Sequence, residues 1–188
     1  MPNYCGYQMK VKGKPENVDE FVKVIQADYS FDDKDNCICD VGRHFWRVFY
    51  ADIYDEEIVD GVKSVYISGS CAWSVYSCMM DGPHTYNEQY PKHCGTTLAI
   101  ESKQLELEIE VFSEEPGVGF MEHFVIIKGD IVTDACIEYC EYDTEEFDTV
   151  KEMNETLGTK FTKRQFAYAR EKDDGYIRVG GIPWDFTI

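Results

Sequence analysis

The strongest constraint on the fold is a strict alternation of apolar residues and glutamates between residues 105 and 111. The apolar positions are Leu105, Leu107, Ile109 and Val111, and the glutamates between them are Glu106, Glu108 and Glu110. Successive side chains of a β-strand point to opposite faces, so a repeat of two indicates a strand. The pattern predicts one face buried in a core and one solvent-facing row of carboxylates.

Two further strands are predicted directly after this one. Residues 114–119 are rich in glycine with one proline, which favours a turn, and Phe120–Lys128 then returns as a strand. A second turn at Gly129 and Asp130 leads into a strand at Ile131–Tyr142. Strands joined by such short turns form an antiparallel meander.

The first hundred residues predict strands separated by helices. Val18, Phe21, Val22 and Ile25 form the apolar stripe of a helix that begins at Pro15 and ends near Asp28. The other elements predicted here are a strand at Tyr4–Gly13, a loop at Ser30–Gly42, strands at His44–Tyr54 and Val62–Cys71 with an acidic connection between them, a short helix at Trp73–Met80, an irregular excursion at Asp81–Gly95 and a helix at Thr96–Gln104.

The C-terminal part predicts helices and a tail. Thr144 is a suitable N-cap for a helix that ends at Gly158. Thr162 and Gln165 have the spacing of a capping box and predict the start of another helix. We expect the apolar residues of the tail to hold it on the body of the protein; they are Trp184, Phe186 and Ile188.

The order of these elements, β-α-β-β-α-β followed by more strands and helices, predicts an α+β fold. We expect an antiparallel sheet with helices on one face, built on a ferredoxin-like (split βαβ) core with a C-terminal extension. Residues 1–142 would form the ferredoxin-like domain. Residues 143–188 would form a helical and irregular extension packed on the same domain.

Acidic residues dominate the charge, and they gather in the middle of the chain. The 188 residues include 36 Asp and Glu against 18 Lys and Arg, and residues 51–150 hold 22 of the acids with 4 bases. We expect no direct binding to nucleic acid or to an anionic membrane, because both need basic side chains. The sequence contains no run of 18 apolar residues, so no membrane span is predicted. We expect a cytoplasmic protein.

The eight cysteines are expected to be reduced thiols that act as small apolar residues, since a cytoplasmic chain of this length folds without disulfides. Cys37, Cys39, His93 and Cys94 are the candidate zinc ligands. One C-x-C and one adjacent His-Cys pair lack the paired knuckles of structural zinc sites. We therefore expect no metal and no cofactor.

Catalysis has only loose candidates in the sequence. Cys71 or Cys78 could act as a nucleophile beside His123 or His44, but no nucleophile elbow, P-loop, Rossmann fingerprint or zinc-protease motif is present. We expect no enzyme. The alternative is that the protein is a small enzyme or a ligand-binding protein with a pocket around Trp73, Cys78 and His123.

Three stretches of the sequence resemble a known family. They are the opening Met1–Cys5, the run Gly69–Ser74 and the segment Phe112–Phe120 with its Glu-Pro-Gly motif. Together they resemble an uncharacterised family of bacteria, phages and plasmids with a YubB-type ferredoxin-like domain, over about residues 1–132. The resemblance implies that fold and a mobile-element setting. It implies no reaction, because no catalytic residues are assigned to the family.

The acidic strand face is the preferred candidate for function. Carboxylates on neighbouring strands could merge into a negative patch that attracts the basic nucleic-acid groove of a partner. The hypothesis is an acidic nucleic-acid mimic from a phage or mobile element that inhibits a bacterial defence nuclease or CRISPR effector, as an anti-CRISPR protein would. The partner-binding residues would be Glu106, Glu108, Glu110, Glu114, Glu115, Asp134, Glu138, Tyr139 and Tyr142.

Two other interpretations of the acidic face stay open at this point. A solvated acidic face can simply keep a protein soluble. A structural homo-oligomer could instead form by pairing edge strands.

Overall fold

The computed structural model describes residues 3–33, 36–80, 94–172 and 175–188. The chain forms two compact units, Met1–Cys136 with Pro183–Ile188, and Ile137–Ile182. The boundary therefore falls inside the strand that was expected to end the first domain at residue 142. The last six residues belong to the first unit and not to the C-terminal extension.

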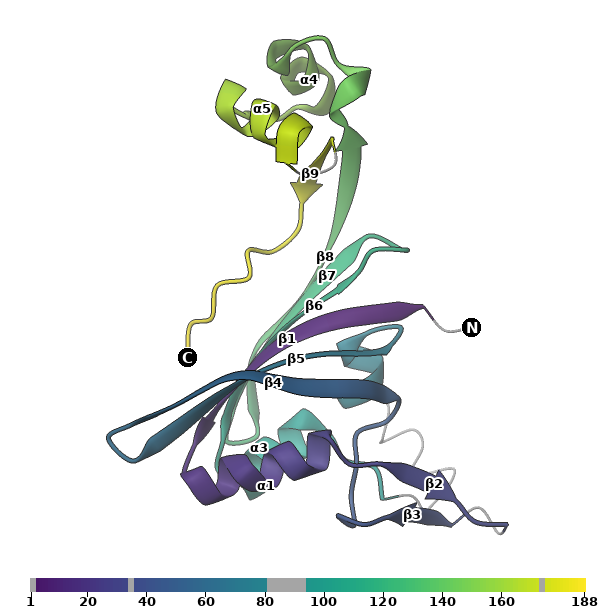
Figure 1. The fold of residues 1–188 in the computed structure, drawn as a ribbon, viewed down its shortest axis with the longest axis vertical. Coiled ribbons are helices and arrows are strands. Elements are labelled where there is room, and N and C mark those ends of the chain that lie inside the picture. The colour runs from purple at the N-terminus through teal and green to yellow at the C-terminus, as the bar shows by residue number, and fades with distance from the viewer. Residues whose placement is uncertain (1–2, 34–35, 81–93, 173–174) are drawn as a thin grey trace. The chain divides into compact units, whose positions relative to one another are not determined.

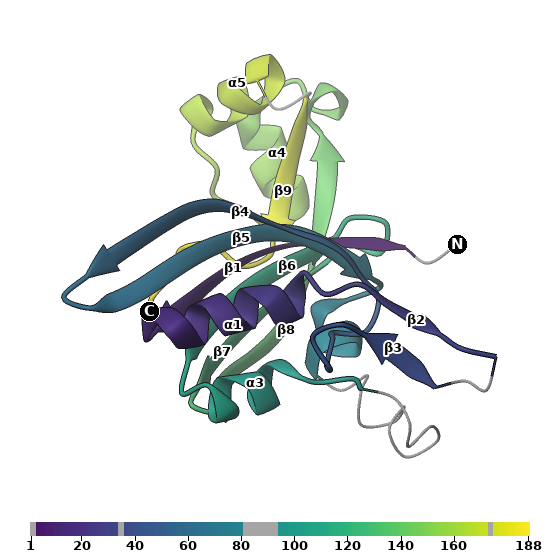
Figure 2. The ribbon, with the colours of Figure 1, turned by 60° about the horizontal axis from the view of Figure 1, so that its bottom comes forward.

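An antiparallel sheet forms the first unit. Its strands are β1 (Tyr4–Gly13), β4 (Val48–Val59), β5 (Val62–Ala72), β6 (Glu108–Glu115), β7 (Phe120–Ile127) and the first part of β8 (Asp130–Asp143). They lie in the order β4-β5-β1-β6-β7-β8. Helices α1 (Pro15–Ile25) and α3 (Leu98–Gln104) lie on the same face of this sheet (Figure 2). The predicted α+β class, with an antiparallel sheet and helices on one face, is confirmed.

The core lies between the sheet and these two helices. Alternate residues of β1 from Cys5 to Val11 are buried, and those between them are half-buried. Phe21 of α1 is fully buried in this core, which also contains Val65 and Ile67 of β5. The helix ends at Ile25, three residues before the predicted end. A period of two in the strands and of 3.6 in the helix brings these apolar faces together.

The connection from β1 through α1 leads to β4, and β5 lies between β1 and β4 in the sheet. Both neighbours of β1, which are β5 and β6, run antiparallel to it. This order is compatible with a split βαβ arrangement. The ferredoxin-like assignment itself stays a prediction.

The β4–β5 hairpin differs from its prediction. Asp55, Glu56 and Glu57 were expected in a connection, but β4 continues through them to Val59. The turn consists of Asp60 and Gly61, with φ angles of 52° and 79°. An Asp-Gly pair with two positive φ angles forms the tight turn that matches the twist of a hairpin. Figure 1 shows the hairpin extending beyond the end of α1.

Three segments between the main strands differ from their predictions or lie mostly outside the described residues. The predicted loop Ser30–Gly42 contains most of the small ribbon formed by β2 (Tyr29–Phe31) and β3 (Cys37–Cys39). A π-helical turn, Tyr76–Met80, replaces the predicted helix at Trp73–Met80. Most of the excursion at Asp81–Gly95, including His93, lies outside the described residues.

The second unit has its own small core. It contains a 3-10 turn (Thr144–Glu146), α4 (Val150–Leu157), α5 (Lys163–Lys172) and β9 (Tyr176–Gly180), which pairs with the end of β8. Its buried residues are Phe147, Met153, Phe166, Ala169 and Ile177. None of the described helices of the chain is long and apolar enough to cross a membrane.

One helix prediction in the second unit is wrong and one is confirmed. The helix expected from Thr144 to Leu157 is interrupted at Phe147, whose backbone is extended with φ −124° and ψ 128°. The Thr144 hydroxyl donates to the Gly175 carbonyl at 2.6 Å. Thr149 caps α4 instead. The predicted capping box is confirmed, since Gln165 N–H donates to the Thr162 hydroxyl and Thr162 N–H donates to the Gln165 side chain.

Candidate functional site

The glutamate row does not form an exposed array. Glu106 precedes β6 in a turn, with a φ angle of 51°, and its carboxylate lies 3.8 Å from Lys14 Nζ. Glu108 is on β6, facing away from the helices, and lies 3.5 Å from Lys12 Nζ. Two of the predicted negative charges are therefore offset by lysines of the same chain.

Glu110 is fully buried, which contradicts the prediction most directly. Its carboxylate accepts hydrogen bonds from Thr187 N–H at 2.5 Å, Ile188 N–H at 3.1 Å and the Thr187 hydroxyl at 3.1 Å. His123 Nε2 lies 2.8 Å from the same carboxylate. Burial alone would raise the pKa of Glu110, but the hydrogen bonds of Thr187, His123 and Ile188 outweigh it and lower that pKa.

The residues that bury Glu110 belong to the C-terminal tail. Phe112 follows Glu110 on the same face, and its ring contacts Trp184 and Phe186 with centroids 6.2 and 5.5 Å away. The ring of His123 stacks on Phe112 at 4.1 Å. The predicted attachment of the tail to the body is confirmed. The sheet face expected to face solvent is an aromatic interface at this point.

The two other acids of β6 that were predicted to bind a partner do not lie together on one exposed surface. Glu114 is half-buried on the face away from the helices. Glu115 is buried, and its carboxylate accepts from Gly117 N–H at 3.1 Å and Val118 N–H at 2.5 Å. Glu115 thus stabilises the β6–β7 turn. Two successive glutamates of a strand lie on opposite faces, so they cannot extend one patch.

The other predicted site residues lie on β8. Asp134 belongs to the first unit and is exposed, and Glu138 is exposed in the second unit. Tyr139 is buried, with the Arg178 guanidinium 4.2 Å from its ring centre. Tyr142 is half-buried against the second core. Neither tyrosine is exposed, which contradicts the predicted partner-binding role, because both pack within the second unit.

The pocket expected around Trp73, Cys78 and His123 is not assembled by these residues. His123 lies on the tail face of the sheet, whereas Cys78 is buried in the helix-side core. Cys71 is in the same core. Hydrogen bonds with the thiols of Cys5 and Cys78, together with burial, raise the pKa of Cys71. A fully buried thiol with a raised pKa does not supply an accessible nucleophile.

Glu122 is a buried polar residue that no sequence pattern predicted. Its carboxylate accepts from Val75 N–H at 2.8 Å, Tyr76 N–H at 3.3 Å and the Ser113 hydroxyl at 2.6 Å. Burial raises the pKa of Glu122, and the hydrogen bonds offset only part of that effect. These contacts hold the start of the π-helical turn on β6 and β7, which is a structural role.

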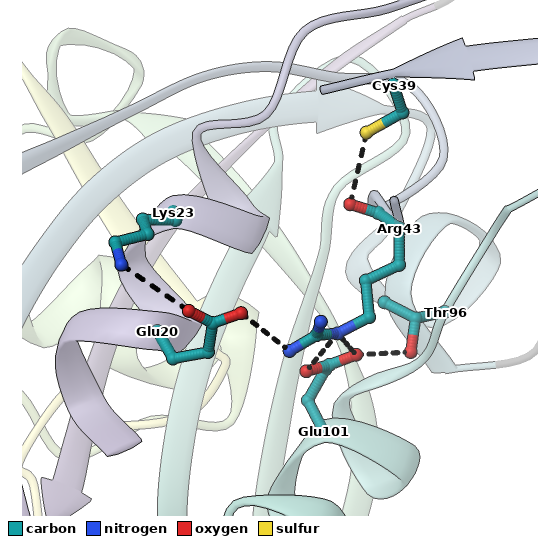
Figure 3. A network of polar contacts seen from close by, with 6 residues as sticks. All are labelled: Glu20, Lys23, Cys39, Arg43, Thr96 and Glu101. Carbon is teal, nitrogen blue, oxygen red and sulfur yellow. Dashed lines mark hydrogen bonds and ion pairs between the residues drawn. The ribbon is translucent and has the colours of Figure 1, made fainter. Parts of the chain in front are cut away.

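A second polar network surrounds Arg43 (Figure 3). The carboxylate of Glu101 is fully buried and accepts from Arg43 Nε at 2.8 and 3.0 Å. The Thr96 hydroxyl donates to the same carboxylate at 2.7 Å, and Arg43 also contacts Glu20 at 3.3 Å. The network therefore joins α1, α3 and the loop segments before His44 and after Gly95.

One pair of cysteines contradicts the expectation that all thiols are reduced. The structure joins Cys37 and Cys94 in a disulfide with a Cα–Cα distance of 6.2 Å. This distance lies within the usual range for disulfides, about 4.4–6.8 Å. Cys5, Cys71 and Cys78 are buried thiols as expected.

Five exposed acids of the first unit lie on the β4–β5 hairpin. The exposed carboxylates of this surface are Asp52, Asp55, Glu56, Glu57 and Asp60. Its exposed apolar residues are Ile53, Tyr54, Ile58, Val59 and Val62. Among the described residues, Glu56 is the one acid of these five that forms an ion pair, and its partner is Lys63 at 2.9 Å. We call these residues, together with the strand β4 that carries most of them, the hairpin surface.

The backbone of β4 adds a second property to the hairpin surface. Among the described strands, β4 has a hydrogen-bonded neighbour on one side only, which is β5. Near its start the open side is partly covered, because Gln26 donates to the Ala51 carbonyl at 2.8 Å. An open strand edge offers N–H and C=O groups to another extended chain.

The second unit contains a concavity of about 310 Å³. Phe161, Tyr168 and Tyr176 supply aromatic walls, and Arg164 and Arg178 supply positive charge. Arg178 is engaged with Glu141 at 2.9 Å. Among the described residues of the lining, none pairs a nucleophile with a general base.

Comparisons with known proteins found no matching family model, no similar curated protein and no similar solved structure.

Proposed function

We propose that the protein is a non-enzymatic interaction protein that binds a basic partner through the hairpin surface. The observation that carries this proposal is the coincidence, on β4, of an open strand edge, exposed apolar side chains and a cluster of carboxylates. Open edges can accept an added strand whose backbone supplies affinity and whose side chains supply specificity.

Charge selects the kind of partner. Residues 52–63 carry five acids and one base, a net charge of −4. A second copy pairing along the same strand would place two such segments side by side, and like charges opposite each other destabilise a sheet. A segment rich in Lys and Arg would instead gain complementary charge. The hairpin surface therefore favours a basic partner over the homo-oligomer of paired edge strands.

The partner class that we propose is a basic nucleic-acid-binding protein of bacteria, such as a defence nuclease or a CRISPR effector. The hairpin would occupy its nucleic-acid groove in the bacterial cytoplasm, as an anti-CRISPR-like inhibitor. The net charge of −18 and the resemblance to a mobile-element family support this proposal. The hairpin acids take the role that the sequence reasoning gave to Glu106, Glu108 and Glu110.

Neutralising the hairpin is expected to abolish competition with nucleic acid. The variant combines Asp55→Asn, Glu56→Gln, Glu57→Gln and Asp60→Asn, which removes four charges while keeping side-chain size. The assay measures displacement of a labelled oligonucleotide from a panel of purified bacterial nucleases and CRISPR effectors. We expect the wild-type protein to displace it from at least one of them and the variant to do so about 10-fold or more weakly, because complementary charge accelerates association.

A matched variant removes four exposed charges from the second unit through Glu145→Gln, Glu146→Gln, Asp148→Asn and Glu155→Gln. It has the same net charge as the hairpin variant and should compete almost like the wild-type protein. Raising the salt concentration should weaken the wild-type competition, since exposed charges are screened. The proposal fails if no member of the panel is displaced, or if the two variants lose activity equally.

A further inference from the structure

The disulfide Cys37–Cys94 lies beside a buried histidine. One ligand atom each from Cys37, His44 and Cys94 lies within 4.8 Å of the others. His44 is fully buried, and the two cysteines are half-buried. Tetrahedral zinc sites hold sulfur at about 2.3 Å and imidazole nitrogen at about 2.0–2.1 Å, which places neighbouring ligand atoms within such a spacing. The three side chains thus form a potential metal-ligand group once the disulfide is open.

The orientation of His44 suits a metal ligand. Its Nδ1 lies 3.0 Å from the Phe45 carbonyl oxygen, which can only accept a hydrogen bond. The proton of the neutral ring is therefore on Nδ1, and Nε2 has the lone pair that a metal needs. Tyr29 stacks on the imidazole with ring centres 3.6 Å apart and an angle of 10°. Metal-binding histidines usually donate their other nitrogen to such an outer-shell acceptor.

The backbone holds His44 and Cys94 next to each other independently of the disulfide. His44 N–H donates to the Cys94 carbonyl at 3.0 Å, and Thr96 N–H donates to the His44 carbonyl at 2.9 Å. A parallel bridge joins His44 to Gly95. The side chains that flank this bridge, Arg43 and Thr96, both bind the buried carboxylate of Glu101 (Figure 3). Reduction of the disulfide would leave this framework in place.

Cys37 reaches the group from the β2–β3 ribbon, which Tyr29 also belongs to. Cys39, two residues further on β3, lies outside the group of three, and its thiol donates to the Arg43 carbonyl at 3.3 Å (Figure 3). The ligand set is therefore two thiolates and one imidazole. Zinc favours this combination, whereas calcium and magnesium take oxygen ligands.

We propose that Cys37, Cys94 and His44 bind Zn²⁺ when the Cys37–Cys94 disulfide is reduced. Reduction breaks the S–S bond and adds two electrons and two protons, which a thiol reductant such as a dithiol supplies as it becomes a disulfide itself. Zinc then bonds to both sulfurs and displaces their two protons to solvent, because the thiolate is the ligand. Oxidation and zinc binding exclude each other, so the site responds to the redox state.

The test loads zinc onto the full-length protein in its two redox states. One sample is reduced with a phosphine, which does not compete strongly for zinc, and the other keeps its disulfide. Both are incubated with Zn²⁺, desalted and analysed for metal by mass spectrometry. We expect close to one zinc per chain in the reduced sample and almost none in the oxidised sample. Co²⁺ in the reduced protein should show the thiolate charge-transfer and visible bands of a tetrahedral site.

Ligand variants then identify the residues. Cys37→Ser, Cys94→Ser and His44→Gln should each weaken zinc binding by at least about 100-fold, since loss of an outer-shell partner alone costs about 10- to 100-fold. Cys140→Ser removes an exposed thiol of the second unit and should bind zinc like the wild-type protein. Because His44 is buried, circular dichroism must show each variant folded, and the half-buried Cys37 gives the most secure comparison.

Three results would overturn the inference. The first is a reduced wild-type protein that retains no zinc after desalting. The second is equal zinc content in the reduced and oxidised samples. The third is a folded Cys37→Ser or Cys94→Ser variant with the same zinc affinity as Cys140→Ser.

Discussion

Replacing Arg43 by methionine is expected to lower the free energy of unfolding by about 3–5 kcal/mol, the usual cost of removing one partner of a buried ion pair. Glu101 has no exposed surface, and the Arg43 side chain is 28% exposed. Without the guanidinium, the carboxylate keeps the Thr96 hydroxyl as a donor but loses its only described positive partner. Chemical denaturation in urea, monitored by circular dichroism, measures the loss.

The double variant Arg43→Met with Glu101→Leu separates the two contributions to that loss. If the cost comes from an uncompensated buried charge, removing the charge as well should restore most of the stability, since apolar replacements of a buried pair are often neutral. A double variant as unstable as Arg43→Met would instead show that the arginine contributes mainly through packing or through its contact with Glu20 at 3.3 Å.

Glu110→Leu is expected to be the second most damaging substitution, at about 3 kcal/mol. It leaves the N–H groups of Thr187 and Ile188 without the carboxylate they bind, and hydrogen bonds to charged groups contribute about 1.5–3 kcal/mol each. Glu108→Gln is the matched control on the same strand. Its carboxylate is 35% exposed and pairs with Lys12 at 3.5 Å, so the change should cost at most about 1 kcal/mol.

The pH dependence gives Glu110 a separate signature. Because its pKa is lowered in the folded protein, its stabilisation is present above the ordinary value of 4.5 and is lost as the pH falls through the lower folded value. Glu122 has the opposite sign, since its raised pKa makes the folded state more stable as the pH falls toward 4.5. The stability difference between wild type and Glu110→Leu should therefore shrink below pH 4.5. A difference that is constant with pH would contradict the role of the Glu110 charge.

The alternation at residues 105–111 predicted the buried face correctly, because Ile109 and Val111 lie in the core, but the strand itself begins only at Glu108. It did not predict what covers the other face. Glu110 is buried by Thr187 and Ile188, which are 77 and 78 residues away, and no local pattern reports such a contact. A period of two shows that two faces differ; it does not show that the polar face meets solvent.

The strand that carries the hairpin surface is indicated by a turn signal in the sequence. Asp60-Gly61 is a strong turn dipeptide, and its position implies that the residues before it belong to a strand. The acids at 55–57 predict a connection instead, because acidic residues are uncommon in strands. An edge strand with one neighbour tolerates them, since their side chains stay in solvent.

Spacing in the sequence places Cys37 and Cys94 among the metal-ligand candidates but does not identify His44 as their partner. Cys37 and Cys94 are 57 residues apart, and His44 is not part of either cysteine motif. The bridge between His44 and Gly95 brings them together, and it is a tertiary contact. The buried network of Glu122 has a weaker indication in the sequence. A charged residue at an inward position of an apolar strand indicates a buried polar network.

Hydrogen exchange of the backbone amides of β4 tests the central proposal most directly. The protein is measured alone and in complex with the effector from which it displaces the oligonucleotide. If a partner strand pairs with the hairpin surface, amides between Ile53 and Val59 on the open side should exchange more slowly in the complex, while those of the second unit stay unchanged. Protection confined to the second unit or to the tail, with β4 unaffected, would contradict the proposal.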